Sequence, residues 1–260
     1  MNTALRARNR EINMRQQGVS VCINKLNKSF GDNHVLKDVD LDVSVGETFS
    51  IIGPSGTGKS ILLRHIIGLE KPDSGRILIN GEPLETSPRN YRSSMVFQSS
   101  ALFNSLTVGE NIGLWLREHR IFPESRIRGI ISEKLAIVGL GGKEGLKTSE
   151  LSGGMKKRVA IARSLAMEPE MVLYDEPTAE LDPVTTDELA ETIISLRGIS
   201  GSTTIIVTHD LNFALYLSDR IAMMHQGRIV AIGTPLEIKT SENPFVKSFV
   251  RTTTKGIYGL

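Results

Sequence analysis

The chain has 260 residues, of which 40% are hydrophobic and 23% are charged, values that are ordinary for one large globular domain. Its 31 basic and 29 acidic residues leave a formal net charge of +2, so no global field calls for nucleic acid as a partner. A single cysteine, Cys22, excludes an internal disulfide and fits a reducing compartment; we expect it to be a small core residue. No apolar run approaches the roughly 20 residues that cross a bilayer.

The N-terminal part of the chain predicts a tail followed by antiparallel strands. Residues 1–18 carry four arginines but no apolar core, which indicates a flexible basic tail rather than a secretory signal. Valine and leucine alternate with polar residues over positions 39–45, as in a strand with one solvated face. Two isoleucines before the turn Asn80-Gly81 indicate another strand. We therefore expect an antiparallel layer within residues 20–97.

A phosphate-binding loop follows the apolar run from Thr48 to Ile52, which predicts one buried strand. The loop fits the pattern G-x-x-x-x-G-K-[ST], in which glycines let backbone N–H groups turn inward around an anion. We expect Lys59, at the start of a helix, to reach the β- and γ-phosphates of a nucleotide, and the Ser60 hydroxyl to bind Mg2+. The predicted phosphate-binding residues are Gly53, Pro54, Ser55, Gly56, Thr57, Gly58, Lys59 and Ser60.

Three further apolar runs end in polar side chains. Gln98 follows a run at 93–97, and its amide oxygen could bind Mg2+ and contact water, although an isolated glutamine is a weak signal. Asp175 and Glu176 follow the run Met171–Tyr174, and ligands of open α/β sheets bind beyond such strand ends. We expect Asp175 to hold Mg2+ through water, and Glu176 to orient or deprotonate an attacking water. His209 follows a run at 203–208, where it could sense the γ-phosphate.

The remaining segments complete a fold prediction. Residues 99–165 read mostly as helices, and residues 187–196 form a helix between two of the apolar runs, as in a parallel sheet. Residues 223–230 read as a hairpin. The predicted fold class is α/β: a P-loop NTPase core of parallel strands flanked by helices, an N-terminal antiparallel β layer and a helical insertion.

With these residues assembled, the chain resembles the ATP-binding subunits of ABC transporters over residues 20–235. The signature Leu151-Ser-Gly-Gly-Met155 carries most of the resemblance, which implies ATP and Mg2+ as cofactors and a head-to-tail dimer that closes over shared ATP. It implies that signature residues bind the γ-phosphate held by a second copy, and that Phe30 stacks on adenine, although an ordinary packing role for Phe30 is nearly as good an interpretation. The residues assigned in this way are Phe30, Ser152, Gly153, Gly154 and Asp182.

Two stretches point to a branch of that family. Residues 97–103 and 111–119, together with Met155 in the signature, resemble the ATPase of MCE-type phospholipid transporters, the MlaF-like subunit of the lipid-asymmetry system. This resemblance implies an MlaE-like integral membrane permease, an MCE-domain lipid-binding subunit and, as an optional component, a STAS-domain protein. It places the chain at the cytoplasmic face of the inner membrane as a peripheral subunit. The ATPase domain would span residues 19–240, with a helical subdomain at about 99–165 and a C-terminal tail at 241–260.

Three alternatives stay open. The chain could power an importer of amino acids or another small solute, or hold nucleotide with little turnover. A soluble ABC ATPase acting on DNA or ribosomes ranks low, because the chain carries neither a long coiled-coil insertion nor a second nucleotide domain. Two residues depart from the family: Glu180 occupies a position that is usually small, and Ile61 replaces a usual threonine. Neither departure touches the predicted Mg2+ ligands or Glu176.

Overall fold

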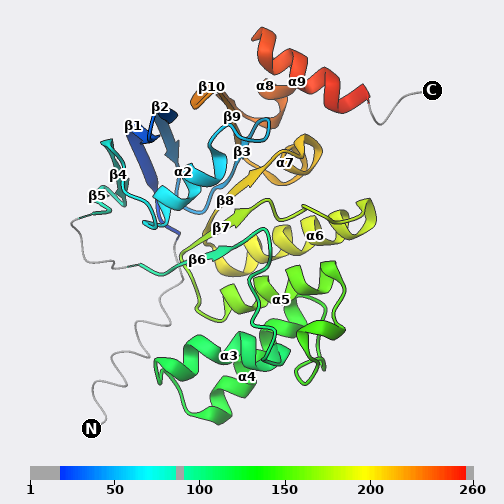
Figure 1. Cartoon of the computed structure of the whole chain (residues 1–260). Coiled ribbons are helices and arrows are strands. Elements are labelled where there is room, and N and C mark those ends of the chain that lie inside the picture. The colour runs from blue at the N-terminus through cyan, green and yellow to red at the C-terminus, as the bar shows by residue number, and fades with distance from the viewer. Residues whose placement is uncertain (1–17, 86–90, 256–260) are drawn as a thin grey trace.

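A central sheet positions the other elements. The structure, a computed structural model, describes residues 18–85 and 91–255, so the predicted basic tail lies outside it except for Gly18. In these residues, the strands of the central sheet are β3 (Thr48–Ile52), β6 (Ser93–Val96), β7 (Met171–Asp175), β8 (Thr203–Thr208), β9 (Arg220–His225) and β10 (Arg228–Gly233). Their order is β10-β9-β3-β8-β7-β6, parallel except for the final β9–β10 hairpin that the sequence predicts (Figure 1).

Helices cover both faces of this sheet, which explains why its strands are continuous apolar runs rather than alternating ones. Met171 and Leu173 face one cluster of buried side chains, to which α2 (Lys59–Ile66) contributes. Val172 and Tyr174 face a second cluster, on the other side of the sheet, with α5 (Gly153–Leu165), α6 (Pro183–Ser200) and α7 (Leu211–Leu217). Helices α2 and α5 therefore lie on opposite faces of the sheet.

A second, antiparallel sheet has the order β2-β1-β4-β5 among the described residues. Its strands are β1 (Val21–Phe30), β2 (Asn33–Val43), β4 (Ser74–Ile79) and β5 (Glu82–Pro83). Two expectations fail here. Strand β2 ends at Val43, so Val45 stands in the following turn and is 55% exposed. Cys22 is half-buried rather than a core residue, because its neighbours Val21 and Ile23 take the inward positions of β1.

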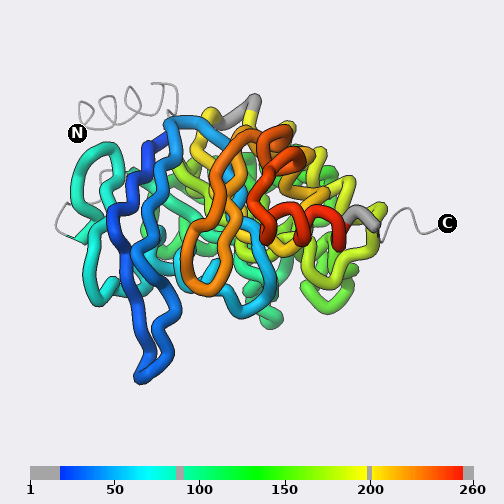
Figure 2. Tube along the Cα trace, turned by 90° about the horizontal axis from the view of Figure 1, so that it is seen from above, coloured from blue at the N-terminus to red at the C-terminus, as the bar shows by residue number. Residues whose placement is uncertain are grey.

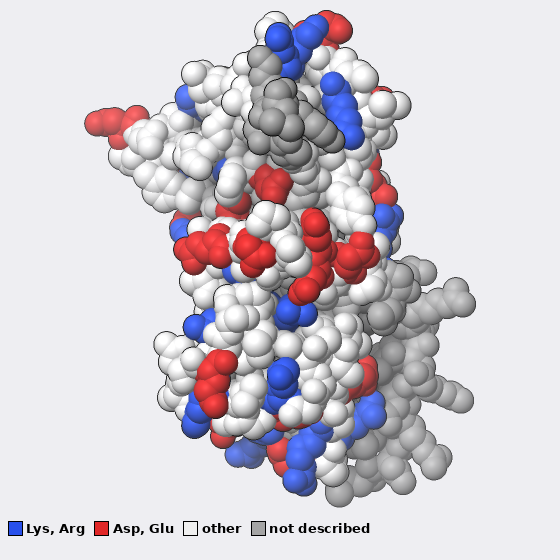
Figure 3. Space-filling model, turned by 90° about the vertical axis from the view of Figure 1, so that its right-hand side faces the viewer, with Lys and Arg blue, Asp and Glu red and all other residues white. Residues whose placement is uncertain are grey.

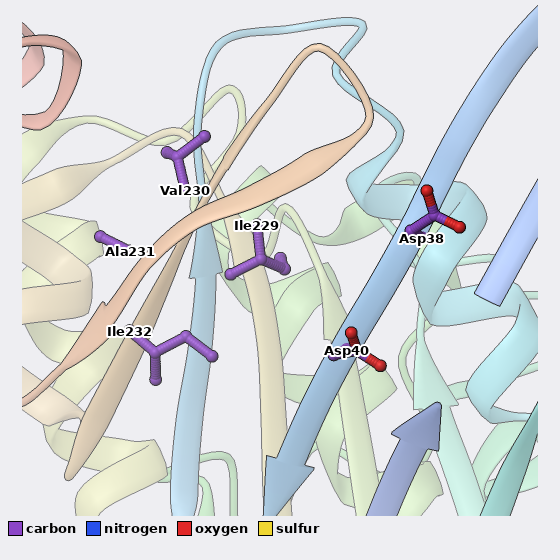
Figure 4. Close-up of a pocket in the computed structure, with 6 residues that line it drawn as sticks. All are labelled: Asp38, Asp40, Ile229, Val230, Ala231 and Ile232. Atoms are coloured by element: carbon purple, nitrogen blue, oxygen red, sulfur yellow. The ribbon is translucent and has the colours of Figure 1, made fainter. Parts of the chain in front are cut away.

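The edge strands of the two sheets meet at a shallow pocket. The backbone N–H of Lys37 donates to the carbonyl of Gly227 at 2.9 Å, and Arg228 lies 3.4 Å from the Asp38 carboxylate. Figure 4 shows Asp38 and Asp40 on β2 across from residues 229–232 of β10. The pocket has a volume of about 310 Å³ and is lined by none of the predicted site residues.

The helical insertion forms the lower part of the molecule in Figure 1. Its elements are α3 (Val108–Glu118), α4 (Glu124–Ile137), the short 3-10 helix η1 (Thr148–Glu150) and α5. Thr107 and Glu110 close the first turn of α3 as a capping box, which explains where that helix begins. Residues 99–107, the first part of the segment predicted to be mostly helical, form turns and bends instead. None of the described helices has the length and apolar character to cross a membrane.

The C-terminal segment is more ordered than a tail. Helix α8 (Pro235–Lys239) and helix α9 (Pro244–Lys255) follow the β9–β10 hairpin, and the tube in Figure 2 shows α9 running beside it. Val246 is fully buried in a cluster with Ile52 and Leu211. The His225 ring stacks on Phe245 with centroids 3.7 Å apart. Helix α9 thus covers one end of the central sheet.

The surface mixes both signs of charge. On the face that Figure 3 presents, acidic side chains gather across the middle, with lysine and arginine above and below them. The small net charge of +2 therefore comes from 31 basic and 29 acidic residues that nearly cancel rather than from few charges.

The anchoring of α9 can be tested by Val246→Ala. Removing two buried methyl groups should lower the free energy of unfolding by about 2 kcal/mol. Chemical denaturation measures this change, with Ser248→Ala on the exposed side of α9 as the control. Equal stability of the two variants would show that α9 does not pack on the sheet in solution.

Candidate nucleotide-binding site

The loop between β3 and α2 leaves the sheet in a conformation that requires glycine at its first position. Gly53 has a φ of 151°, and a Cβ atom added there would lie 2.2 Å from the carbonyl oxygen of Met224. Gly58, with a φ of 101°, caps α2 in the left-handed region. A loop of this kind, opening into a helix N-terminus, presents backbone N–H groups to an anion.

Lys59 is the buried cation of this loop. Its side chain is only 5% exposed, and Nζ donates to the carbonyls of Gly53 and Pro54 at 2.9 and 3.0 Å. The Glu176 carboxylate lies 3.7 Å from Nζ. Burial lowers the pKa of Lys59, and the charge of Glu176 opposes that effect. The ammonium is therefore held at the loop by neighbours that an incoming phosphate could supplement.

Ser60 and Asp175 supply oxygen atoms suited to Mg2+. The Ser60 hydroxyl donates to Asp175 Oδ1 at 2.7 Å. Burial raises the pKa of the Asp175 carboxyl, and the hydrogen bond from Ser60 opposes this rise. Hydroxyl and carboxylate oxygens suit this hard cation, which usually keeps waters and substrate phosphates as its other ligands. One hydroxyl and one carboxylate, in contact at the phosphate-binding loop, fit such binding.

Glu176 and His209 meet at the ends of β7 and β8. The backbone N–H of His209 donates to Glu176 Oε2 at 3.2 Å, and His209 Nδ1 lies 2.8 Å from the same oxygen. Glu176 has a φ of 46°, a left-handed conformation that is strained for a residue other than glycine. The structure thus brings Lys59, Asp175, Glu176 and His209 together at one edge of the sheet.

Four other predicted site residues lie at the N-terminal ends of α5 and α6. Ser152 caps α5 by accepting a hydrogen bond from the Met155 backbone N–H at 3.3 Å, and both Ser152 and Gly153 are exposed. Gly154 is buried, and a Cβ atom added there would lie 2.3 Å from the Thr185 side chain on α6. Asp182 caps α6 by accepting a 3.0 Å hydrogen bond from the Thr185 backbone N–H.

Phe30 and Gln98 both present side chains at the surface. Phe30 ends β1 with 44% of its side chain exposed, and Lys28 Nζ lies 5.2 Å from its ring centroid. An exposed aromatic face of this kind could stack on a flat base. Gln98 stands exposed just after β6, and its backbone carbonyl accepts a hydrogen bond from Lys157 Nζ at 2.5 Å.

The sequence shows a basic cluster at Lys156-Lys-Arg158, for which a solvated helix face is the favoured interpretation and help with phosphate charge the alternative; the favoured interpretation is wrong for Lys157. It is a lysine with 5% exposure on the inward face of α5, and its charge interacts with Asp175, Glu176 and Glu180. Burial lowers its pKa, and those three carboxylates oppose that effect. A signal was present in the sequence: position 157 falls three residues after Gly154 and three before Ala160, which face the core on the same side of the helix.

Comparison with known proteins identifies the class. Residues 36–179 match the family model described as ABC transporter, and the structure resembles ABC ATPase domains, which confirms the predicted P-loop NTPase fold. The chain belongs to this family and is an ATP-binding subunit of an ABC transporter. ABC ATPases of this family bind and hydrolyse ATP.

Two similar proteins are named after different molecules. The probable ribonucleotide transport ATP-binding protein mkl of Mycobacterium tuberculosis is 40% identical over 249 residues, covering 94% of this chain and 69% of its own. The chloroplastic protein trigalactosyldiacylglycerol 3 of Arabidopsis thaliana is 42% identical over 243 residues, covering 85% and 70%.

Two solved structures share the fold. The structure of CbiO1 from Clostridium perfringens, part of the CbiONQ transporter complex, has a TM-score of 0.79 and 32% identity, covering 91% of this chain and 97% of that one. The ATP-binding cassette MJ0796, a dimer in a post-hydrolysis state with ADP and Pi, has a TM-score of 0.74 and 31% identity, covering 83% and 98%.

The role of the buried ammonium can be tested by Lys59→Ala. Loss of the charge beside the loop should weaken ATP binding by about 100-fold or more, roughly 2.7 kcal/mol. Titration with a fluorescent ATP analogue measures this, with the exposed Lys239→Ala as the control. Affinity equal to that of the control would refute the phosphate-loop assignment.

Glu180 stands where the backbone itself favours a smaller residue. Its φ is 67°, so glycine would adopt the same conformation without steric strain. If its carboxylate restrains the site, Glu180→Gly should raise the ATPase rate by roughly two- to tenfold, or about 0.4 to 1.4 kcal/mol of activation free energy. Steady-state phosphate release measures the rate, with Glu180→Ser to separate loss of the carboxylate from relief of strain. An unchanged rate in both variants would make the acidic side chain incidental.

Proposed function

We propose that two copies of this chain bind two ATP molecules head to tail, each ATP lying between the Lys59 loop of one copy and the Ser152 region of the other. The arrangement of α2 and α5 carries this proposal, since the two predicted phosphate-binding helix ends belong to helices on opposite faces of one sheet. One chain is thereby poorly placed to close both on the same phosphate. The dimeric state of the MJ0796 cassette supports the same arrangement.

In this proposal hydrolysis proceeds at the edge of the sheet. A Glu176 oxygen accepts a proton from water while the water oxygen bonds to the γ-phosphorus, and the bond to the bridging oxygen breaks to release ADP and phosphate. Lys59 balances the charge on the phosphates, and His209 holds the Glu176 carboxylate in place. Ser60, Asp175 and Gln98 would hold Mg2+, which neutralises phosphate charge when bound. Loss of the γ-phosphate removes the group that both copies grip, so the dimer opens.

A separate membrane permease would convert this closing and opening into transport. The segment after Gln98 offers a surface for it, because Phe97 and Phe103 are 36% and 53% exposed. The buried Asn111 side chain fixes this segment: its Oδ1 accepts from the Phe103 N–H at 2.8 Å, and its Nδ2 donates to the Phe103 and Thr107 carbonyls at 3.1 and 2.9 Å. A rigid apolar surface beside Gln98 suits a partner that must respond to the nucleotide site.

The proposed cargo is phospholipid, carried by an MlaE-like permease with an MCE-domain lipid-binding subunit and, optionally, a STAS-domain protein. The chain would act peripherally, at the cytoplasmic face of the inner membrane. Support comes from residues 97–103 and 111–119, which resemble lipid-transport ATPases, and from the Arabidopsis relative, whose name refers to a lipid.

Small-solute import is the second candidate. It is favoured by relatives named as sulfate/thiosulfate and spermidine/putrescine import ATP-binding proteins, at 41% and 43% identity. Purification of the tagged chain with its membrane partner, followed by lipid extraction and mass spectrometry, separates the two. Enriched phospholipid beside an MCE-domain subunit supports the lipid proposal. A solute-binding subunit without enriched lipid would contradict it.

The dimer is tested by Glu176→Gln. The amide preserves shape but cannot accept the proton, so ATP and Mg2+ should trap a stable dimer and lower the hydrolysis rate by about 100-fold or more. Light scattering after size exclusion gives the mass, with Glu242→Gln, an exposed residue of the C-terminal region, as the control. A variant that stays monomeric with ATP and Mg2+ would refute the proposed closure.

A further inference from the structure

Two basic side chains of α5 hold the segment that follows β6. Lys157 Nζ donates to the carbonyl of Gln98 at 2.5 Å. Arg163, two turns further along the same helix, donates from Nη1 to the carbonyl of Ala101 at 2.7 Å and from Nη2 to that of Ser100 at 3.0 Å. Three carbonyl groups of the four-residue segment 98–101 are therefore bound by one helix.

The held segment is strained. Ser100 and Ala101 have φ values of 63° and 47°, in the left-handed region that costs about 1–2 kcal/mol for a residue with a Cβ atom. Their carbonyl groups are those that Arg163 binds. Such a conformation persists only where its surroundings determine it, so the position of Gln98 at the front of this segment depends on α5.

Lys157 is also within electrostatic reach of the nucleotide site of its own chain. Its ammonium interacts with the carboxylates of Asp175 and Glu176, which end β7, and with Glu180 in the next loop. The same helix begins at the Ser152 cap, five residues earlier. Lys157 thus donates a hydrogen bond to Gln98 and interacts electrostatically with the carboxylates of the site. The helix that carries it also carries the residues predicted to bind the other copy's ATP.

We propose that Lys157 is a positioning residue for ATP hydrolysis: it holds the Gln98 segment to α5, so that capture of a second copy's nucleotide at Ser152 sets the place of Gln98 in its own site. Arg163 supports the same segment. This inference rests on the proposed head-to-tail dimer. Lys157 acts through Gln98 and the neighbouring carboxylates.

The kinetic test uses Lys157→Met, which keeps most of the apolar stem but leaves the Gln98 carbonyl without its donor. We expect kcat for ATP to fall about tenfold while KM stays within about twofold, because the loss concerns the arrangement for hydrolysis rather than ATP binding. Lys157→Arg, which keeps the charge and the donors, should restore most of kcat. Lys156→Met, one residue earlier on α5, is the matched control and should resemble wild type.

A double-mutant cycle shows whether the effect passes through Gln98. If it does, Lys157→Met should reduce kcat much less in a Gln98→Ala background than in wild type. Independent, multiplying effects would overturn the inference. So would a raised KM with unchanged kcat, or a fall in kcat explained by a smaller folded fraction in thermal unfolding.

Amide hydrogen exchange tests the contact without relying on hydrolysis. In Lys157→Met the amides of residues 98–101 should exchange about tenfold faster than in wild type or Lys156→Met, while those of β7 keep their protection. Equal exchange in all three proteins would overturn the role of Lys157. If exchange differs between the three proteins as expected, but the wild-type protein neither dimerises nor hydrolyses ATP, the proposed function is overturned while the contact made by Lys157 stands.

Discussion

The parallel register of β3, β8 and β7 is the constraint on which the rest of the structure depends. Ile52 pairs with Thr208, and Asp175 with Val207, so the three strands end at the same edge of the sheet. Residues that are distant in sequence therefore converge there. The hydrogen bond between Ser60 and Asp175 joins the first turn of α2 to the end of β7, across 115 residues of sequence. A shift of one strand by one residue would turn these side chains to the other face.

Buried charged groups are concentrated at this edge of the sheet, and burying a charge is unfavourable unless another group pairs with it. Lys59 is buried beside the Glu176 carboxylate, and Asp175 is also nearly buried. Desolvation of such groups costs several kcal/mol per ion, and their mutual attraction only partly offsets this cost. An anionic ligand bound at the loop would attract the Lys59 ammonium and so offset part of its desolvation cost. The strained backbone at Glu176 fits the same reading, since strain of this kind gathers at sites where geometry serves chemistry.

The sequence predicted the local motifs and the strand ends that form the site, and it missed individual long-range contacts. The loop at 53–60 and the strand before Asp175 follow from short patterns, because glycine conformations and buried strands leave local marks. The contact of Lys157 with Gln98 spans 59 residues, so no pattern along α5 reveals its partner. The packing of α9 on the sheet was missed for the same reason: Val246 is buried in a cluster with Ile52 and Leu211, which are distant from it in sequence. The failed expectation for Cys22 shows that an alternating strand decides burial by register rather than by residue type.

The nucleotide site and the exposed apolar surface beside Gln98 have different roles in the proposed function. The edge that holds Lys59, Asp175 and Glu176 concerns nucleotide, and nothing in its chemistry distinguishes one transported molecule from another. In the proposed function, cargo passes through a separate membrane partner. The exposed Phe97 and Phe103, proposed to contact that partner, lie within a few residues of Gln98. Because α5 holds that segment from behind, motion of the helix that carries Ser152 would reach the apolar surface and Gln98 together. Under the proposed function, the exposed side chains of this segment would contact the membrane partner, and the buried contacts of α5 would connect that partner to the nucleotide site.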